Sequence, residues 1–184
     1  MIEKIFNDVL LITSKLHSDN RGFFLEGYNN ELLKNYDLDI DFVQDNISYS
    51  EKKNTIRGLH YQKKPYEQLK FIRVINGSVF DVFIDARPSS KTFGKYGSII
   101  LDSPEKGLII PKGYIHGFCT LKNDTLVSYK VDALYDADSE IGVIWNDNYL
   151  NIDWPLGHSQ PIISNKDQNL LSWDTFKNEI NNYE

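Results

Sequence analysis

Short apolar runs recur along the whole chain and are separated by residues that favour turns. Ten such runs cover residues 9–13, 22–28, 42–49, 56–61, 69–75, 78–84, 96–101, 108–110, 115–121 and 125–131. Short strands at this spacing are typical of a β sandwich or a β barrel. The pattern therefore predicts an all-β protein.

Turn and helix signals complete this prediction. Asn76 and Gly77 lie between two of the runs and predict a tight hairpin, and further reversals are expected at residues 104–107, 111–113 and 123–124. Helix is expected only at residues 31–36 and 169–182, the latter because of its apolar spacing. Since neither a repeat nor a linker interrupts the chain, we expect residues 1–184 to form one domain.

Composition and charge narrow the possible partners. The chain has 184 residues, a net charge of −6 and a pI near 5.2, which argues against a nucleic-acid-binding surface because such surfaces cluster Lys and Arg. An acidic protein can still bind one small anion through a few arginines in a cleft.

Location is also indicated by the sequence. No run approaches the roughly 20 apolar residues of a membrane span, and the N-terminus lacks the order of a signal peptide. We therefore expect a cytoplasmic protein with no membrane partner. The single cysteine, Cys119, excludes an internal disulfide and is expected to be a buried structural thiol.

The candidate chemistry lies on the expected strands. Arg57, Gly58 and His60 follow one another closely, and Lys70 lies on the next run, alternating with apolar residues. Gly58 is expected to mark a bulge that redirects its neighbours. A core histidine and an edge-strand lysine whose ammonium reaches solvent are the structural alternatives to a catalytic site.

Further polar residues have two interpretations each. Tyr129 shares a strand face with apolar residues, so it is either a core tyrosine bonded to backbone or an acid in a cavity. His116 follows a turn, where it either caps the turn or binds a ligand. Arg21 and Glu26 flank two phenylalanines and form either a surface ion pair or a binding site.

Metal and cofactor motifs are missing from the sequence. None of the four histidines is paired at ligand spacing, and there is no phosphate loop, nucleophile elbow or dinucleotide fingerprint. We therefore expect neither a metal nor a cofactor. Histidine, tyrosine and lysine in one barrel suit removal of a proton beside a carbonyl, with the imidazole as base and the ammonium stabilising the enolate.

An ordered set of motifs resembles the dTDP-4-dehydrorhamnose 3,5-epimerase family. The set includes RGFFLE at residues 21–26, QDN at 44–46, RGLH at 57–60, KFIRV at 70–74, GSVFDV at 77–82 and YK at 129–130, and it continues through 88–93, 110–118, 144–147, 152–155 and 164–167. The resemblance implies a cupin-like jelly-roll barrel with a few short helices, and a homodimer with strand exchange. It also implies a role in deoxysugar biosynthesis for cell-surface polysaccharide.

The resemblance also implies roles for individual residues, carried over by motif position. His60 matches the family's base, Asp167 its carboxylate partner, Tyr129 the acid on the opposite face of the sugar, and Lys70 the group near the C4 oxygen. Binding positions are matched by Arg57 and His116 at the pyrophosphate and sugar, Gln44 and Asn46 at the nucleotide, Tyr135 stacking on thymine, Glu140 and Lys166, and by Arg21 and Glu26 reaching across the dimer.

Two departures from the family pattern concern specificity. Leu134 stands where the family usually has a second aromatic beside the stacking tyrosine, and the loop of residues 63–68 is less small and polar than usual. The expected substrate is a dTDP-linked 4-keto-6-deoxy sugar, inverted at C3 and C5. Alternatives are an epimerase acting at one carbon or on another nucleotide sugar, a non-catalytic sugar-nucleotide-binding jelly roll, and a metal-dependent cupin enzyme.

Overall fold

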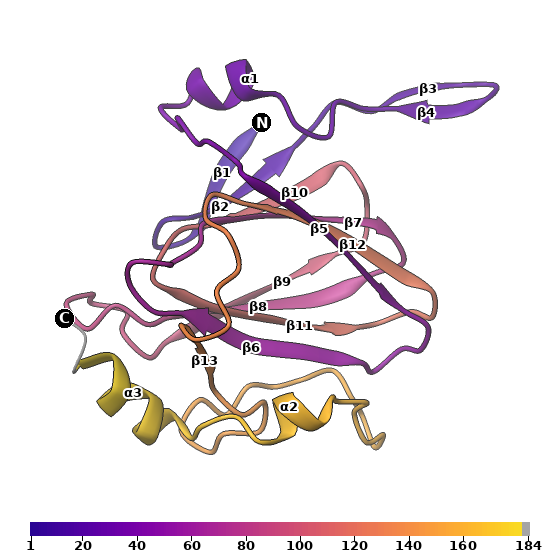
Figure 1. Ribbon diagram of the computed structural model, residues 1–184. Helices are drawn as coiled ribbons and strands as arrows, with labels where there is room; N and C mark the ends of the chain where they lie inside the picture. The colour runs from indigo at the N-terminus through magenta and orange to yellow at the C-terminus, as the bar shows by residue number, and fades with distance from the viewer. Residues whose placement is uncertain (182–184) are drawn as a thin grey trace.

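The computed structural model describes residues 1–181, without the side chain of Leu32, and its body is two antiparallel sheets packed face to face (Figure 1). The six-stranded sheet has the order β1 (Ile2–Phe6), β2 (Val9–Thr13), β10 (Lys106–Ile110), β7 (Lys70–Asn76), β12 (Thr125–Val131), β5 (Gln44–Ser50). The five-stranded sheet has the order β13 (Glu140–Gly142), β6 (Ile56–Gln62), β11 (Tyr114–Thr120), β8 (Val79–Asp85), β9 (Tyr96–Leu101). The all-β, cupin-like jelly roll is thereby confirmed.

Within residues 1–181, a hairpin and three short helices lie outside the two sheets. Strands β3 (His17–Asp19) and β4 (Gly22–Phe24) form a two-stranded arm that projects away from the body (Figure 1). Helix α1 (Asn30–Lys34) lies near the base of this arm, and α2 (Asn165–Gln168) and α3 (Trp173–Asn181) lie beneath the five-stranded sheet (Figure 1). The arm exposes Phe23 and Phe24, which are 58% and 68% accessible to solvent.

Alternation along the strands divides the apolar side chains between two faces of each sheet. On β11, Ile115 and Cys119 pack against the C-terminal segment, whereas Tyr114 and Phe118 point between the sheets. Helix α3 contributes Trp173 and Phe176 to the outer of these cores. Residues 169–181 thus cover the five-stranded sheet, and Cys119 is buried as expected.

Most of the expected strands are present, with ends shifted by a few residues. The runs at 9–13, 96–101 and 125–131 have the observed bounds, whereas the run at 22–28 is a strand only as far as Phe24. Strands β1, β3 and β13 and helix α2 had no sequence prediction. The expected helices at 31–36 and 169–182 are α1 and α3, and residues 182–184 lie outside the described part of the chain.

The expected hairpin at Asn76 and Gly77 is wrong. The strands on either side, β7 and β8, belong to different sheets, so this turn carries the chain across the barrel. Gly77 has φ +89°, and a Cβ there would lie 2.4 Å from the Thr125 hydroxyl. The Asn76 amide donates to the Asp124 carbonyl at 2.6 Å. The glycine therefore permits a tight corner against β12, and local turn chemistry does not reveal which sheet follows it.

Candidate active site

The space between the sheets is apolar at one end and polar at the other. A cavity of about 830 Å³ opens at the polar end. Eleven of the thirteen sequence-predicted site residues line it: Gln44, Asn46, Arg57, His60, Lys70, His116, Tyr129, Tyr135, Glu140, Lys166 and Asp167. They come from both sheets and from the segments around β13 and α2. The fold therefore brings together residues that are up to 123 positions apart in the chain, from Gln44 to Asp167.

A bulge at Gly58 places two of these side chains on the same face. Arg57 pairs with Phe118, and His60 pairs with His116, so β6 uses one residue more than β11 between the two pairs. Without this extra residue, Arg57 and His60 would point to opposite faces of the sheet. Gly58 has φ +117°, and a Cβ there would lie 2.6 Å from the Cα of Gly117. The expected bulge is confirmed, and glycine is required there.

His60 is held by a carboxylate from the C-terminal segment. Its Nε2 lies 2.8 Å from Asp167 Oδ1, and the backbone N–H of Gly58 donates to the other carboxylate oxygen at 3.2 Å. Burial would raise the pKa of Asp167, but these hydrogen bonds outweigh it and lower the pKa below its ordinary value. An ionised Asp167 keeps the ring proton on Nε2, so the lone pair of neutral His60 is on Nδ1.

Glu140 lies on the other side of this imidazole. One of its carboxylate oxygens is 3.9 Å from His60 Nδ1, and the other accepts hydrogen bonds from Lys166 and, at 2.9 Å, from the Tyr135 hydroxyl. Burial would raise the pKa of Glu140, but the bonds from Lys166 and Tyr135 lower it below its ordinary value. Glu140 is therefore held as an anion beside the His60 ring.

Lys70 enters the cavity from the facing sheet. Burial lowers the pKa of its ammonium to about 8. The ammonium donates to Gln68 Oε1 at 2.6 Å, and the Gln68 amide donates to the Ala133 carbonyl at 2.9 Å. Gln68 thus holds a weakly solvated cation in the cavity wall. The sequence interpretation did not identify Gln68. The one feature that could have indicated it is an uncharged polar side chain two positions before Lys70.

Tyr129 also comes from the six-stranded sheet, opposite His60. Its ring packs beside Val127 and Ile72 in the apolar core between the sheets. Within residues 1–181 its hydroxyl has no hydrogen-bond partner, so the interpretation as a core tyrosine bonded to backbone is wrong. Burial raises the pKa of the Tyr129 phenol, which keeps it protonated at neutral pH.

Three other polar lining residues, Arg57, Gln44 and Asn46, are held by hydrogen bonds. The Arg57 guanidinium donates to the Tyr49 carbonyl at 2.7 Å and to the Ser50 hydroxyl at 3.1 Å. Gln44 donates to Asn46 at 2.8 Å and accepts from the backbone N–H of Tyr135 at 3.0 Å. These bonds fix side chains from β5 and β6 at the cavity edge.

His116 has a buried acidic partner that the sequence interpretation missed. Its Nε2 lies 3.0 Å from both carboxylate oxygens of Asp81, which is fully buried on β8. Burial raises the pKa of Asp81, and the contact with His116 only partly opposes this. The sequence signal was a carboxylate in the middle of an apolar strand, where an acid needs a partner. His116 lies within β11 and does not cap the preceding turn.

Arg21 and Glu26 are not at the cavity of their own chain. Arg21 lies on the projecting arm and pairs with Asp19 at 2.6 Å, so the expected surface pair with Glu26 is wrong. Glu26 instead accepts from the Asn29 amide at 3.5 Å. The hairpin geometry of the arm brings Asp19 and Arg21 together across a tight turn, whereas Glu26 lies beyond its end.

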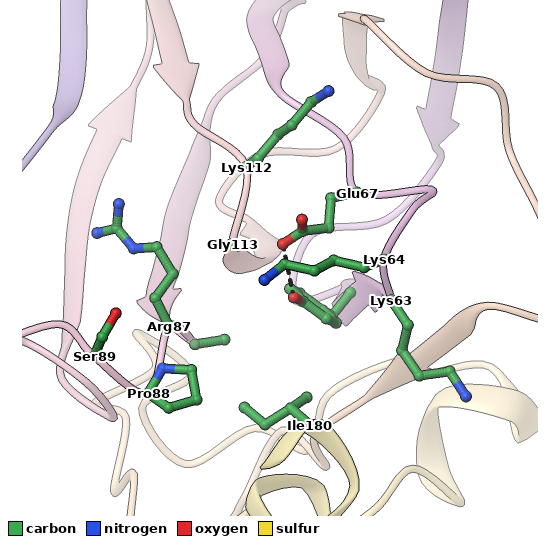
Figure 2. A pocket seen from close by; sticks show the side chains of 11 residues that line it. Lys63, Lys64, Glu67, Arg87, Pro88, Ser89, Lys112, Gly113 and Ile180 are labelled. Carbon is green, nitrogen blue, oxygen red and sulfur yellow. Dashed lines mark hydrogen bonds between the residues drawn. The ribbon is translucent and has the colours of Figure 1, made fainter. Parts of the chain in front are cut away.

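A second, smaller hollow of about 260 Å³ lies between the 63–67 loop, residues 87–89 and Ile180 of α3 (Figure 2). It carries Lys63, Lys64 and Glu67, but none of the predicted site residues. Arg87 in its wall is bound to Asp8 and Asp85 at 2.6 and 2.7 Å. Arg87 is therefore engaged in structural ion pairs, and the larger cavity remains the candidate site.

Two further features of residues 1–181 concern metal ligands and helix length. In that range, no group of three or more His, Cys, Asp or Glu side chains is arranged to hold a metal ion. None of the helices described there is long and apolar enough to cross a membrane.

Comparison with known proteins identifies the family. A family model described as dTDP-4-dehydrorhamnose 3,5-epimerase matches residues 3–175. The dTDP-4-dehydrorhamnose 3,5-epimerase of Shigella flexneri is 43% identical over 164 residues, which are 88% of this chain and 89% of that protein.

Two solved structures are similar in fold and sequence. The dTDP-4-dehydrorhamnose 3,5-epimerase of Bacillus anthracis, with TDP and PPi bound, has a TM-score of 0.88 and 44% identity, covering 94% of this chain and 99% of that one. The dTDP-6-deoxy-D-glucose-3,5-epimerase of Legionella pneumophila, in complex with dTDP-4-keto-L-rhamnose, has a TM-score of 0.91 and 36% identity, covering 98% and 96%. On this evidence, the chain belongs to the dTDP-4-dehydrorhamnose 3,5-epimerase family.

Proposed function

We propose that this protein is a nucleotide-sugar epimerase that inverts C3 and C5 of dTDP-4-keto-6-deoxyglucose without a cofactor. One observation carries the proposal: a carboxylate-held imidazole and a protonated phenol, His60 and Tyr129, project into one cavity from opposite sheets. Inversion of a carbon requires a base on one face and an acid on the other, and this arrangement supplies both. The similar proteins named above act on or bind dTDP-linked sugars, which supports the substrate class.

His60 starts the reaction in this proposal. The C4 ketone makes the hydrogens at C3 and C5 acidic, and Nδ1 of His60 takes the C5 proton. The imidazolium that forms lies between two anions, Asp167 at 2.8 Å and Glu140 at 3.9 Å. These carboxylates stabilise the charge that develops on the ring.

Lys70 and Tyr129 complete the inversion. The C–H bond pair moves into an enolate whose negative charge rests on the C4 oxygen, next to the Lys70 ammonium. Tyr129 then delivers its phenolic proton to the opposite face of C5, and the resulting phenolate and imidazolium exchange protons with solvent. The same cycle at C3 gives the second inversion.

The nucleotide end of the substrate is assigned to the rest of the cavity. Arg57 and His116 contact the diphosphate and sugar, Gln44 and Asn46 contact the nucleotide, and Tyr135 stacks on the base. Glu140 and Lys166 complete the wall. Tyr135 is about half exposed and Leu134 beside it is 64% exposed, so the base is bound at the open edge of the cavity.

We further propose a cytoplasmic homodimer with exchanged strands, formed by one domain per chain. Two features support it: the arm carries exposed Phe23 and Phe24, and β5 ends the six-stranded sheet with exposed Ile47 and Tyr49. An apolar arm and an unpaired sheet edge are typical of surfaces that a second copy covers. In the dimer, Arg21 and Glu26 reach the partner's nucleotide, which accounts for their distance from their own cavity.

Deuterium counting tests the reaction. The purified protein is incubated with dTDP-4-keto-6-deoxyglucose in D₂O without added metal or cofactor, and the sugar is analysed by mass spectrometry and NMR. Deuterium at both C3 and C5 supports the proposal. Deuterium at one carbon would favour the single-site epimerase instead. No exchange would contradict the reaction and favour another nucleotide sugar or a non-catalytic binding protein.

A further inference from the structure

Two histidine–aspartate pairs lie side by side on one face of the five-stranded sheet. His60 and His116 are directly paired residues of β6 and β11, and both line the cavity. Each imidazole bonds a carboxylate through Nε2, to Asp167 in one pair and to Asp81 in the other. The two pairs therefore consist of the same chemical groups.

The two pairs differ in the number of hydrogen-bond donors that contact the carboxylates of Asp167 and Asp81. Asp167 accepts a second hydrogen bond from the backbone N–H of Gly58 at 3.2 Å, so it is stable as an anion beside a neutral imidazole. Asp81 is fully buried, and within residues 1–181 His116 Nε2 is its only hydrogen-bond partner, 3.0 Å from both oxygens. An anionic Asp81 beside a neutral His116 would be a fully buried charge with a single hydrogen-bond donor, which is costly.

Two protonation states of the second pair avoid that charge. In one, Asp81 is ionised and His116 is an imidazolium, with protons on both nitrogens. In the other, Asp81 is a neutral acid that donates to Nε2, so the proton of neutral His116 lies on Nδ1. Both states carry a proton on Nδ1, and Nδ1 has no hydrogen-bond partner in the described part of the chain. It is free to donate to a ligand.

We propose that Asp81 is a positioning residue that keeps Nδ1 of His116 protonated, so that His116 donates a hydrogen bond to the substrate's diphosphate while His60 remains the base. This inference rests on the proposed function, because it takes a dTDP-linked substrate as the ligand. The groups that face His116 from neighbouring strands are Asp81 of β8 and His60 and Arg57 of β6, and Arg57 favours an anion at the same place.

The protonation of Nδ1 is measured by nitrogen-15 NMR of the histidine rings. The chain has four histidines, and loss of a signal in His116→Gln assigns the ring. Nδ1 of His116 is expected to carry a proton at neutral pH, with and without dTDP. A lone pair on Nδ1 at neutral pH would overturn the proposal. This measurement needs only wild-type protein and the assignment variant.

Two substitutions at position 81 separate positioning from packing. Asp81→Asn can still donate from its amide to Nε2 and is expected to keep most of the dTDP affinity. Asp81→Leu has a similar branched shape but is larger and has no polar atom, and is expected to weaken dTDP binding about tenfold and to raise KM more than it lowers kcat. Equal dTDP affinity in Asp81→Leu and wild type, with a folded variant by circular dichroism, would contradict the proposal.

Asp167→Asn is the matched control in the other pair. This substitution is expected to remove most of the turnover while the affinity for dTDP changes little. Asp81→Leu is expected to do the opposite, because it weakens dTDP binding more than it lowers kcat. The NMR and binding measurements require no turnover, so they separate the two proposals. If Nδ1 stays protonated but no deuterium enters the sugar, the epimerase proposal fails and the role of Asp81 stands. If deuterium enters and Nδ1 carries a lone pair, the role of Asp81 fails.

Discussion

His60 and His116 are directly opposite one another on adjacent antiparallel strands, and both imidazoles face the same cavity. Their partners approach from different parts of the fold: Asp167 from α2 and Asp81 from β8. The two carboxylates have different donors, and we propose that one imidazole accepts a proton while the other donates one. The predictions below test how the cavity divides this work.

His60→Asn should lower turnover by about 100- to 10,000-fold, because no other lining group is placed and held as this base is. The assay is deuterium entry into dTDP-4-keto-6-deoxyglucose, followed by mass spectrometry. The affinity for dTDP, measured by calorimetry, serves as the control and should change little. Substantial residual exchange in His60→Asn would rule out His60 as the base.

Lys70→Met should abolish most activity and stabilise the fold. Burial lowers the pKa of Lys70 from 10.5 to about 8, so at neutral pH the folded state carries the cost of a buried ammonium. The variant should gain about 1 to 3 kcal/mol in the free energy of unfolding at pH 7. Between pH 8 and 10.5 the unfolded chain binds more protons than the folded one, so the stability of the wild type rises with pH there and the gain fades.

The Lys70 ammonium also predicts how activity decreases at alkaline pH. In the proposed mechanism the ammonium stabilises the enolate, so kcat/KM should fall as the pH rises through about 8, the pKa of Lys70 in the fold. Urea unfolding at several pH values and initial rates over the same range provide the measurements. A destabilised Lys70→Met, or a rate that stays constant up to pH 10.5, would contradict this account.

Tyr129→Phe should separate exchange from inversion. The phenylalanine ring fills the same space beside Val127, so the fold should be retained. His60 can still remove and return a proton on one face, and deuterium should therefore enter the sugar without a change of configuration. The rate of inversion, followed by NMR of the product, should fall about 100- to 1,000-fold. Inversion at the wild-type rate would remove Tyr129 from the mechanism.

Gly58→Ala should impair both the fold and the site. A Cβ at this position would lie 2.6 Å from Gly117 Cα and 2.8 Å from the His116 carbonyl, and the positive φ of 117° adds strain. We expect a loss of about 2 to 4 kcal/mol in the free energy of unfolding. Gly22→Ala is the matched control, because it also has a positive φ of 130° but open space around its Cβ. Equal losses in the two variants would show that the close approach to Gly117 is not important.

Phe23→Ser combined with Phe24→Ser should dissociate the proposed dimer. These side chains are 58% and 68% exposed on the arm, so the substitution costs the isolated chain little and weakens a docked arm. Sedimentation velocity should show a shift from dimer to monomer, and KM should rise because Arg21 and Glu26 no longer reach the partner's nucleotide. Ile100→Ser, 49% exposed on β9, is the control. A wild-type protein that is monomeric would contradict the homodimer.

Local pattern was sufficient for the strands and for some site residues. Period-two alternation on β12 put Tyr129 on the face of Val127 and Val131, and a glycine inside β6 indicated a bulge. Such signals depend on neighbouring residues along the chain, so a single sequence contains them. Strand β3 of the arm has only three residues, all exposed, and shows no comparable pattern.

By itself, the sequence determined the all-β class, the family resemblance and eleven of the residues that line the cavity. Tertiary structure alone decided that Asn76 and Gly77 cross between sheets, that Arg21 lies away from its own site, and that Asp81 is the partner of His116. The physical reason for this division is that strand pairing and core packing bring together residues that are far apart in the chain. The charge and proton positions of buried groups follow from those neighbours, which only the folded chain provides.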